Sequence, residues 1–323
     1  MVVTRRNILS DSNVRDKYIE GVKLLKQDFL RPDWTNTYDV FVIWHYHAMM
    51  EPTPPGSDRN AAHQGPSFLP WHRWFLILLE HHLQRVLDDP NFGLPYWDWA
   101  ADGELPPDQQ PRTPIWAHDC MGGSGSRVTT GPFREGQWQV NIESRGYPNA
   151  ILVPTNRPLR RAFRRGANSL PTKEDVRRAI IRGEPSNVIY DARPWDRNSE
   201  SFRNELEGWW PDAPGMHNLV HVWVGGDMGP ASSPNDPVFF LNHCNVDRIW
   251  ENWKQRHVNP TYLPDNNAGT ELRGHRLNDR LFPATEAETK KRKKGNLFDP
   301  IYRGRVHPVD LLDVSARYVY DTF

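Results

Sequence analysis

The stretch GMHNLVHVWVGG, residues 215–226, places His217 and His221 four residues apart. On a helix, side chains with this spacing leave the same face one turn apart and can bind one ion. His243 follows in NDPVFFLNHCNVDRIWENW, residues 235–253, on the inward stripe of an expected apolar helix. These three histidines predict a three-imidazole metal site that is shared by two helices.

A second set of three histidines lies in the first third of the chain. His45 stands in the apolar run YDVFVIWHYHAMM, and His63 stands in the loop PPGSDRNAAHQ. His72 follows in PWHRWFLILLEHHLQRVL, an expected helix that begins at Pro70. No thiolate or carboxylate takes the corresponding positions in either set, and all-imidazole ligation suits copper, zinc or iron. Two helices and a loop are therefore expected to converge on a second ion.

The chain as a whole predicts a mainly α fold: a four-helix bundle that holds the metal ions, with long loops and a few short strands. In the last expected helix, Asp236 and Pro237 resemble an N-cap and a first helical residue. Apolar periodicity and capping residues predict helices at residues 12–27, 36–50, 70–88, 173–182, 201–208, 215–222 and 236–256. The 29 prolines and 22 glycines gather between the helices and predict loops, notably at residues 51–70, 102–170 and 183–197.

Composition narrows the class of function. The two histidine sets lie far apart in 323 residues and must meet in space, which predicts a single domain over residues 1–323. The 40 basic and 40 acidic residues cancel, which argues against a nucleic-acid or membrane partner and for a small substrate. No run approaches the roughly 20 apolar residues of a membrane span. The charged residues after TRRNIL predict that no signal peptide is present.

Two further features are expected to be structural. Cys120 and Cys244 are too few for a disulfide framework, and free cysteine usually behaves as a small buried hydrophobe. We therefore expect both to be reduced. The polybasic run KKRKK at residues 290–294 is expected to be a solvated surface loop, because such blocks of like charge are commonly disordered, although a patch for an acidic partner is the alternative.

These motifs resemble those of the type 3 copper proteins, and most closely the compact bacterial tyrosinases. The matching pieces follow in order along nearly the whole chain: TPPGSDRNAAH, SFLPWHR, LPYWDW, MGG, TGPF, LPT, FRNELEGW, MHNLVHVWVGG, SPNDPVFFLNHCNVDRIW and YVYD. The resemblance implies two copper ions that together bind dioxygen as co-substrate. Their ligands would be the two histidine sets: His45, His63 and His72 for the first ion, and His217, His221 and His243 for the second.

The resemblance also implies roles for residues around the ligands. Glu207 and Asn218 match a carboxylate and an amide proposed to hold a water that accepts the proton of a phenol. The alternative for Glu207 is a carboxylate on a helix surface. Phe239 matches an aromatic residue that packs over the second copper, although a plain core residue would look the same. Val222 stands where some relatives have an arginine, so one anchor for a substrate carboxylate is missing.

Two residues of the last helix are expected behind the ligands. Asn242 replaces a histidine that precedes the last ligand in many relatives. Its influence on the second metal site is therefore expected to differ from that of the histidine. Asp247, one turn beyond His243, either orients a ligand ring or pairs with Arg248 or another cation that braces the helix. Relatives also bring an N-terminal strand with an arginine near the C-terminal tyrosine motif. By resemblance, residues 2–6 would meet residues 318–321, and no cysteine would be linked to a ligand histidine.

The implied function is tyrosinase-like: hydroxylation of monophenols to o-diphenols and oxidation of o-diphenols to o-quinones by dioxygen. A catechol or o-aminophenol oxidase without monophenol activity is the alternative within this chemistry, and a haemocyanin-like oxygen carrier is the alternative outside it. The chain stops directly after YVYD, without an appended C-terminal shielding domain, which favours the oxidase. A dizinc hydrolase is disfavoured because such sites usually include carboxylate ligands. Some relatives leave the cell with a copper-delivering carrier protein, so such a carrier is a candidate partner, and either a cytoplasmic location or export with the carrier fits.

Overall fold

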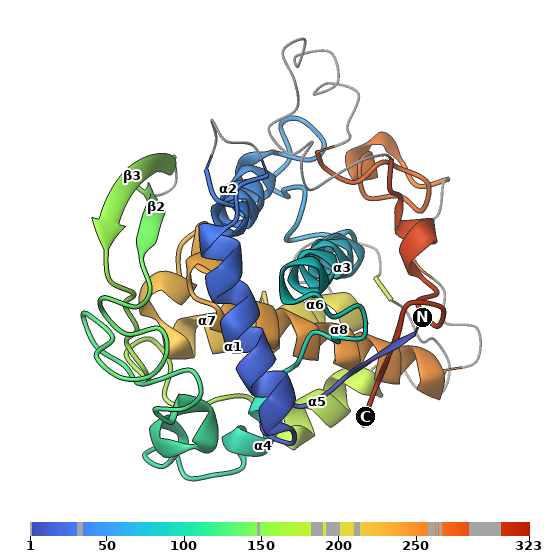
Figure 1. Cartoon of the computed structure of the whole chain (residues 1–323). Coiled ribbons are helices and arrows are strands. Elements are labelled where there is room, and N and C mark those ends of the chain that lie inside the picture. Colours follow the sequence, from blue (N-terminus) through green and yellow to red (C-terminus); the bar gives the residue numbers. More distant parts are fainter. Residues whose placement is uncertain are drawn as a thin grey trace.

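A computed structural model shows a mainly helical chain in which two pairs of short strands accompany the helices (Figure 1). The polybasic run at 290–294 and most of the expected loop 183–197 lie outside the described part of the chain. The described residues are 2–30, 35–146, 149–181, 190–191, 201–209, 214–257, 262, 264, 267–283 and 305–323.

The helices predicted from sequence are all present, and the mainly α fold is confirmed. The described helices are α1 Ser12–Gln27, α2 Thr37–Met50, α3 Phe68–Leu87, α4 Trp99–Gly103, α5 Lys173–Ile180, α6 Phe202–Glu207, α7 Met216–Val224 and α8 Val238–Arg256. The short helix α4 was not predicted. The predicted start of α3 at Pro70 was wrong, since the helix begins two residues earlier. Proline is tolerated there because the first N–H groups of a helix have no intrahelical acceptor.

The beginning of α8 also differs from its prediction. The helix begins at Val238, and Pro237, expected as the first helical residue, is its N-cap. Asp236 lies before it in an extended conformation, and its carboxylate accepts a hydrogen bond from the Val238 N–H at 3.1 Å. The same carboxylate forms a fully buried ion pair with Arg161, 2.7 Å from Nε. Asp236 therefore satisfies a helical N–H, as expected of a capping residue, while it also holds a distant segment.

Two small sheets flank the helices. β1 pairs in parallel with β4, and β2 pairs with β3 in an antiparallel hairpin. Their bounds are β1 Val3–Arg5, β2 Val140–Arg145, β3 Ile151–Arg157 and β4 Tyr318–Tyr320. The first pair confirms the expected meeting of the chain ends. The hairpin lies within a stretch predicted as loop, because its apolar alternation is weak and Pro154 stands inside β3.

Four helices, α2, α3, α7 and α8, carry five of the six histidines of the two sets. α1 packs against α2 and α3, on the side from which Figure 1 is viewed. Aromatic rings fill the space between α2, α3 and α8: Trp44 lies 5.4 Å from Trp71, and Phe75 stacks on Phe240 at 5.7 Å. Such rings bury large apolar areas and hold the helices in fixed positions. No described helix is both long and apolar enough to cross a membrane.

The two cysteines are free and buried, as expected of reduced cysteines. Burial raises the pKa of each thiol to about 12, so both are protonated at neutral pH. The Cys244 thiol donates to the carbonyl of Leu94 at 3.4 Å. Cys244 therefore packs on the side of α8 that faces the chain termini.

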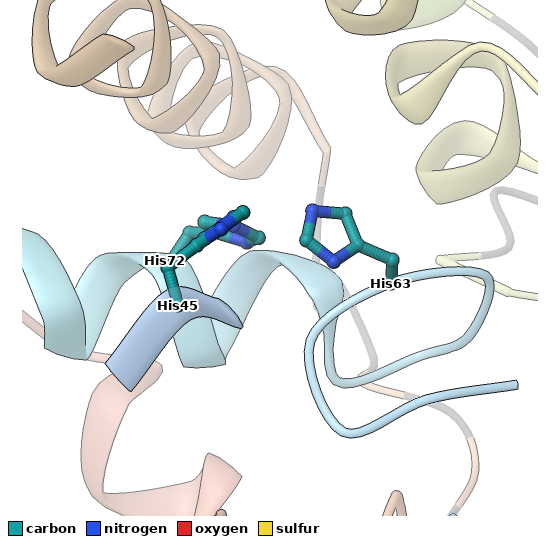
Figure 2. A group of neighbouring side chains, drawn as sticks. All are labelled: His45, His63 and His72. Atoms are coloured by element: carbon teal, nitrogen blue, oxygen red, sulfur yellow. The ribbon is translucent and has the colours of Figure 1, made fainter. Parts of the chain in front are cut away.

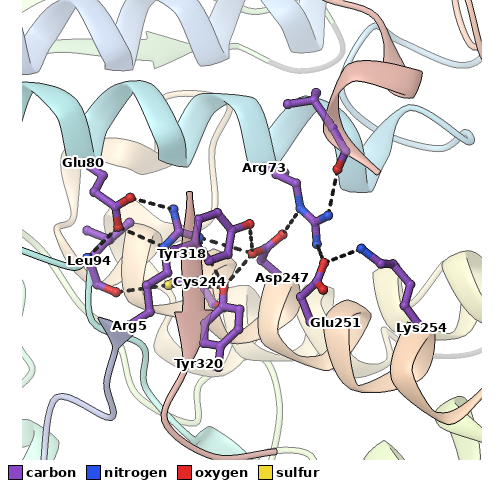
Figure 3. Close-up of polar contacts among 11 residues, drawn as sticks. Arg5, Arg73, Glu80, Leu94, Cys244, Asp247, Glu251, Lys254, Tyr318 and Tyr320 are labelled. Atoms are coloured by element: carbon purple, nitrogen blue, oxygen red, sulfur yellow. Dashed lines mark hydrogen bonds and ion pairs between the residues drawn. The ribbon is translucent and has the colours of Figure 1, made fainter. Parts of the chain in front are cut away.

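A buried network of charges ties the chain ends to the bundle (Figure 3). Arg5 of β1 donates through Nε to Glu80 of α3 at 2.9 Å and through Nη1 to Asp247 of α8 at 3.2 Å. The guanidinium also lies 3.5 Å from the ring centroid of Tyr318. Because these residues come from β1, α3, α8 and β4, the network locks both termini onto two ligand-bearing helices.

Asp247 is the centre of this network. Its carboxylate also accepts hydrogen bonds from Arg73 Nε at 2.6 Å and from the hydroxyls of Tyr318 and Tyr320 at 2.6 Å each. Burial raises its pKa, but the charges of Arg73 and Arg5 outweigh that effect and lower it below the ordinary value. No hydrogen bond joins Asp247 to a histidine among the described residues. The carboxylate thus braces α8 through Arg5 and Arg73.

Candidate metal centre

The first histidine set meets as the sequence predicts. His45 comes from α2, His72 from α3 and His63 from the loop between them, and their rings face a common space (Figure 2). One nitrogen of each ring lies within 4.8 Å of one nitrogen of each of the others. All three side chains are buried. This spacing could hold one metal ion.

The second set lies beside the first. His217 and His221 of α7 and His243 of α8 also place one nitrogen each within 4.8 Å of one another. The rings of His72 and His243 stack at 4.1 Å, so the two sets share a wall. The Nε2 atoms of His217 and His243 face each other at 3.1 Å. Two neutral imidazoles can converge in this way when a cation binds both lone pairs.

Backbone carbonyls set the orientation of three ligand rings. The Nδ1 atoms of His45, His72 and His221 lie 2.7, 2.8 and 2.6 Å from the carbonyl oxygens of Ala231, Phe68 and Met228, respectively. Each Nδ1 must donate there, which leaves the lone pair on Nε2. These three Nε2 atoms are buried and have no hydrogen-bond partner among the described residues. Unpaired buried acceptors that converge in this way fit a metal ion.

The remaining rings are held less completely. His217 Nδ1 lies 3.4 Å from the carbonyl of Glu207, while the buried Nδ1 atoms of His63 and His243 have no partner in the described part of the chain.

Burial lowers the pKa of all six imidazoles, to about 3 for His45 and to about 4 for His221. The rings are therefore neutral at physiological pH. Six neutral imidazoles, with no thiolate or carboxylate in either set among the described residues, suit copper, zinc or iron ions.

A pocket of about 490 Å³ opens onto both histidine sets. Asn218 and Val222, one turn apart on α7, line its wall as the sequence hypothesis requires for a substrate site. Trp209 and Met49 line other parts of the wall. No Asp, Glu, Lys or Arg side chain lines the pocket within the described part of the chain. The described part of the pocket wall is therefore uncharged.

Phe239 lies within the core rather than in the pocket lining. Its ring is fully buried and lies 4.1 Å from that of His243 and 4.9 Å from that of His45. Phe68, which the sequence analysis did not single out, has a similar position: its ring lies 4.9 Å from His72 and 4.9 Å from His217. Phe68 lies one helical turn before His72, and this spacing could have predicted its contact with the ligand. Both rings separate the ligands from bulk water.

Glu207 is fully buried at the end of α6, so its alternative position on a helix surface is wrong. Oε1 accepts hydrogen bonds from the Gln64 N–H at 2.6 Å and from Trp209 Nε1 at 2.8 Å. Oε2 accepts from Arg203 Nη1 at 2.7 Å. Burial raises the pKa of Glu207, and these donors oppose the shift. Glu207 is therefore connected to the pocket wall by its hydrogen bond with Trp209. Its hydrogen bond with Gln64 connects it to the loop that carries His63.

The contact with Gln64 has a backbone reason. Gln64 directly follows His63 and has φ of 62°, a left-handed conformation that is uncommon for residues other than glycine. The carboxylate of Glu207 satisfies its N–H and so stabilises the turn that presents His63. This partnership was not predictable, because the two residues are 143 positions apart.

Asn242 lies directly before His243 and is fully buried. Neither its Nδ2 nor its Oδ1 has a hydrogen-bond partner among the described residues. Leaving a buried amide unpaired costs about 1–3 kcal/mol, so this residue is a weak point of α8 next to the second histidine set.

The comparisons with known proteins agree with this geometry. The family model "Common central domain of tyrosinase" matches residues 35–256. The chain is 35% identical to a tyrosinase from Streptomyces glaucescens over 100% of both chains, and 36% identical to grixazone synthase from Streptomyces griseus subsp. griseus over 82% of this chain and 88% of that protein. A polyphenol oxidase structure from Thermothelomyces thermophila covers 100% of this chain and 89% of its own, with a TM-score of 0.70 and 20% identity, and supports the fold. The chain therefore belongs to the tyrosinase family of type 3 copper proteins, and is a copper phenol oxidase that uses dioxygen.

Proposed function

We propose that this enzyme is a tyrosinase that hydroxylates monophenols to o-diphenols and oxidises o-diphenols to o-quinones. The observation that carries the proposal is Asn218, which follows the ligand His217 and lines the pocket that opens onto both histidine sets. Two copper ions supply the redox chemistry that activates dioxygen. The proposed ligands are His45, His63 and His72 for one ion and His217, His221 and His243 for the other.

Monophenol hydroxylation requires that the phenol lose its proton before it reacts. We propose that Glu207 and Asn218 hold a water that accepts this proton. Asn218 supplies an amide at the pocket wall, and Trp209 connects that wall to the buried carboxylate of Glu207. Val222 leaves the pocket wall neutral, so the aromatic ring of the substrate binds by apolar contact. Phe239 packs against His243 from within the core and keeps the ligand rings in place.

Replacing Asn218 with alanine is expected to lower monophenol hydroxylation about 10²-fold, and to lower diphenol oxidation much less, because only the first reaction needs phenol deprotonation. Glu207→Gln is expected to act in the same direction. Oxygen uptake with tyrosine and with catechol measures both reactions. Ser233→Ala is the matched control, since Ser233 lines the same pocket and has no assigned role in proton transfer. Equal losses on both substrates would contradict the assignment, provided that copper content stays unchanged.

The alternative is an oxidase that acts only on o-diphenols or o-aminophenols. Uptake with catechol and o-aminophenol but not with tyrosine would support it. A haemocyanin-like carrier would bind oxygen reversibly and oxidise none of the three. The single domain over residues 1–323 and the copper-delivering carrier protein stay predictions.

Replacing Asn242 with histidine is expected to keep both copper ions and to change the pH profile or the substrate ratio, by about tenfold. An imidazole can become cationic near neutral pH, whereas the amide of Asn242 cannot. Metal analysis and pH profiles with catechol check the result. If Asn242→His restores copper to a His243→Ala background, the ligand on α8 has been assigned one residue too late.

A further inference from the structure

The segment 162–168 runs along the C-terminal end of α7. The N–H groups of Ala162 and Arg164 donate to the carbonyls of Val224 and Trp223, at 2.9 and 2.8 Å. The ring of Phe163 stacks on that of Trp223 at 5.2 Å. These contacts satisfy carbonyls that a helix end leaves without partners, and they fix the segment against the helix.

Gly166 brings this segment against the pocket wall. A Cβ atom at Gly166 would lie 2.6 Å from Cγ1 of Val222 and 3.3 Å from the carbonyl oxygen of Val222, so a side chain does not fit. Val222 itself lines the pocket. Arg165 directly precedes Gly166, and the Cα atoms of the two residues lie about 3.8 Å apart. The segment therefore packs directly against Val222 of the pocket wall, and Arg165 is the neighbour of the contacting residue.

Two adjacent arginines of this segment have no acidic partner in the described part of the chain. Arg165 is exposed, and Arg164 is half-buried, with its guanidinium bonded to Asn168 at 3.1 Å (carbonyl oxygen) and 2.8 Å (Oδ1), both neutral acceptors. Neither forms an ion pair with any described residue. In contrast, Arg157 and Arg161 in the same part of the chain are both paired with aspartates. Arg165 is therefore accessible to solvent, and Arg164 adds a second positive charge in the same short segment next to Val222.

The backbone of this segment is unusual at Arg164, where φ is 64°. A non-glycine residue in the left-handed region is uncommon and points to a constraint on the local structure. Here the conformation lets the Arg164 N–H cap α7 while the chain turns toward Gly166. The backbone of the two arginines is thus fixed by a turn that is hydrogen-bonded to the end of α7.

We propose that Arg164 and Arg165 form a cationic rim that selects phenols with a carboxylate on the side chain opposite the hydroxyls. The described residues of the pocket wall carry no charge, so the phenol ring binds against this wall. The two arginines then bind the carboxylate at the far end of the substrate. Guanidinium groups bind carboxylates through paired hydrogen bonds and attract them over several ångströms. The proposal rests on the phenol oxidase activity and needs no monophenol hydroxylation.

The test compares 3-(3,4-dihydroxyphenyl)propionate with its amide on the copper-loaded full chain. Arg165→Ala is expected to lower the acid-to-amide ratio of kcat/KM about two- to fivefold, through KM of the acid, as for the loss of one exposed ion pair. Arg165→Glu is expected to lower the ratio about tenfold, and Arg165→Lys to keep most of it. Arg164→Asn, which tolerates the left-handed backbone, is expected to act like Arg165→Ala. Salt at about 0.5 M should reduce the wild-type preference.

Arg317→Ala is the matched control, because Arg317 is exposed and precedes β4, away from α7. An unchanged ratio in Arg165→Glu, or an equal change in Arg317→Ala, would overturn the rim. Equal losses on acid and amide would also overturn it, because they would show damage to the end of α7. Calorimetric binding of 3-phenylpropionate and its amide tests the rim without turnover. Loss of acid binding in Arg165→Glu supports the rim even if tyrosine is not hydroxylated.

Discussion

Replacing His72 with alanine is expected to remove one of the two copper ions and to abolish phenol oxidation. Its Nε2 is buried without a partner, its Nδ1 is held by the carbonyl of Phe68, and its ring stacks on that of His243. Changes outside a ligand set commonly cost about 10- to 100-fold in metal affinity or activity, so loss of a ligand should cost more. Metal analysis and oxygen uptake with catechol measure both effects.

The matched control is His81→Ala, an exposed histidine of the same helix. It is expected to retain two copper ions and full activity. His243→Ala is expected to remove the copper ion of the second set. Retention of two ions and of catechol oxidation in His72→Ala would show that the ligand assignment on α3 is wrong.

Asp247→Asn is expected to lower the free energy of unfolding by about 3–5 kcal/mol, because it removes the buried carboxylate that lies between Arg5 and Arg73 and leaves each with one acidic partner, Glu80 or Glu251. For a chain of this size the melting temperature should fall by roughly 6–15 °C. Asp98→Asn is the control, since Asp98 lies 3.6 Å from Arg248 and remains partly exposed. Its loss should cost less than about 1 kcal/mol. Equal effects of the two variants on thermal unfolding would contradict the central role of Asp247.

The same network predicts how stability depends on pH. The charges of Arg73 and Arg5 lower the pKa of Asp247 below 3.8, although burial alone would raise it. A lowered carboxyl pKa contributes stability that is fully present above the ordinary value and is lost as pH falls through the folded value. The difference in stability between wild type and Asp247→Asn should therefore shrink below about pH 4. Denaturant unfolding at a series of pH values checks this, and a constant difference would contradict it.

The ligand-bearing helices were predictable because their signals are local. His217 and His221 are four residues apart, and this spacing alone places both rings on one face of α7. Apolar periodicity located α1 at its observed bounds. The hairpin of β2 and β3 was not predicted because most of its residues are only partly buried and do not alternate strictly between buried and exposed. Strand formation depends strongly on packing against neighbouring strands, so the residues of one strand alone predict it weakly.

The surroundings of the ligands depended on distant contacts. The carbonyls of Ala231 and Met228 orient two ligand rings, yet every residue has a carbonyl, so neither position carries a sequence signal. Glu207 could equally have been exposed until α6 was placed against the His63 loop. Asp247 had several cations as candidate partners, and only packing of β1 and α3 against α8 selected Arg5 and Arg73.

The sequence by itself determined the six imidazoles, the helices that carry five of them and the neutral overall charge that points to a small substrate. Residue identity and helical spacing are properties of short stretches, so they survive without knowledge of the fold. Only the tertiary structure decided which carbonyls orient three of the rings, which acid braces α8, and that Gly166 packs against Val222 in the segment that carries Arg164 and Arg165. Those contacts join residues far apart in the chain, and their partners are chosen by shape and burial, which no spacing along the chain encodes.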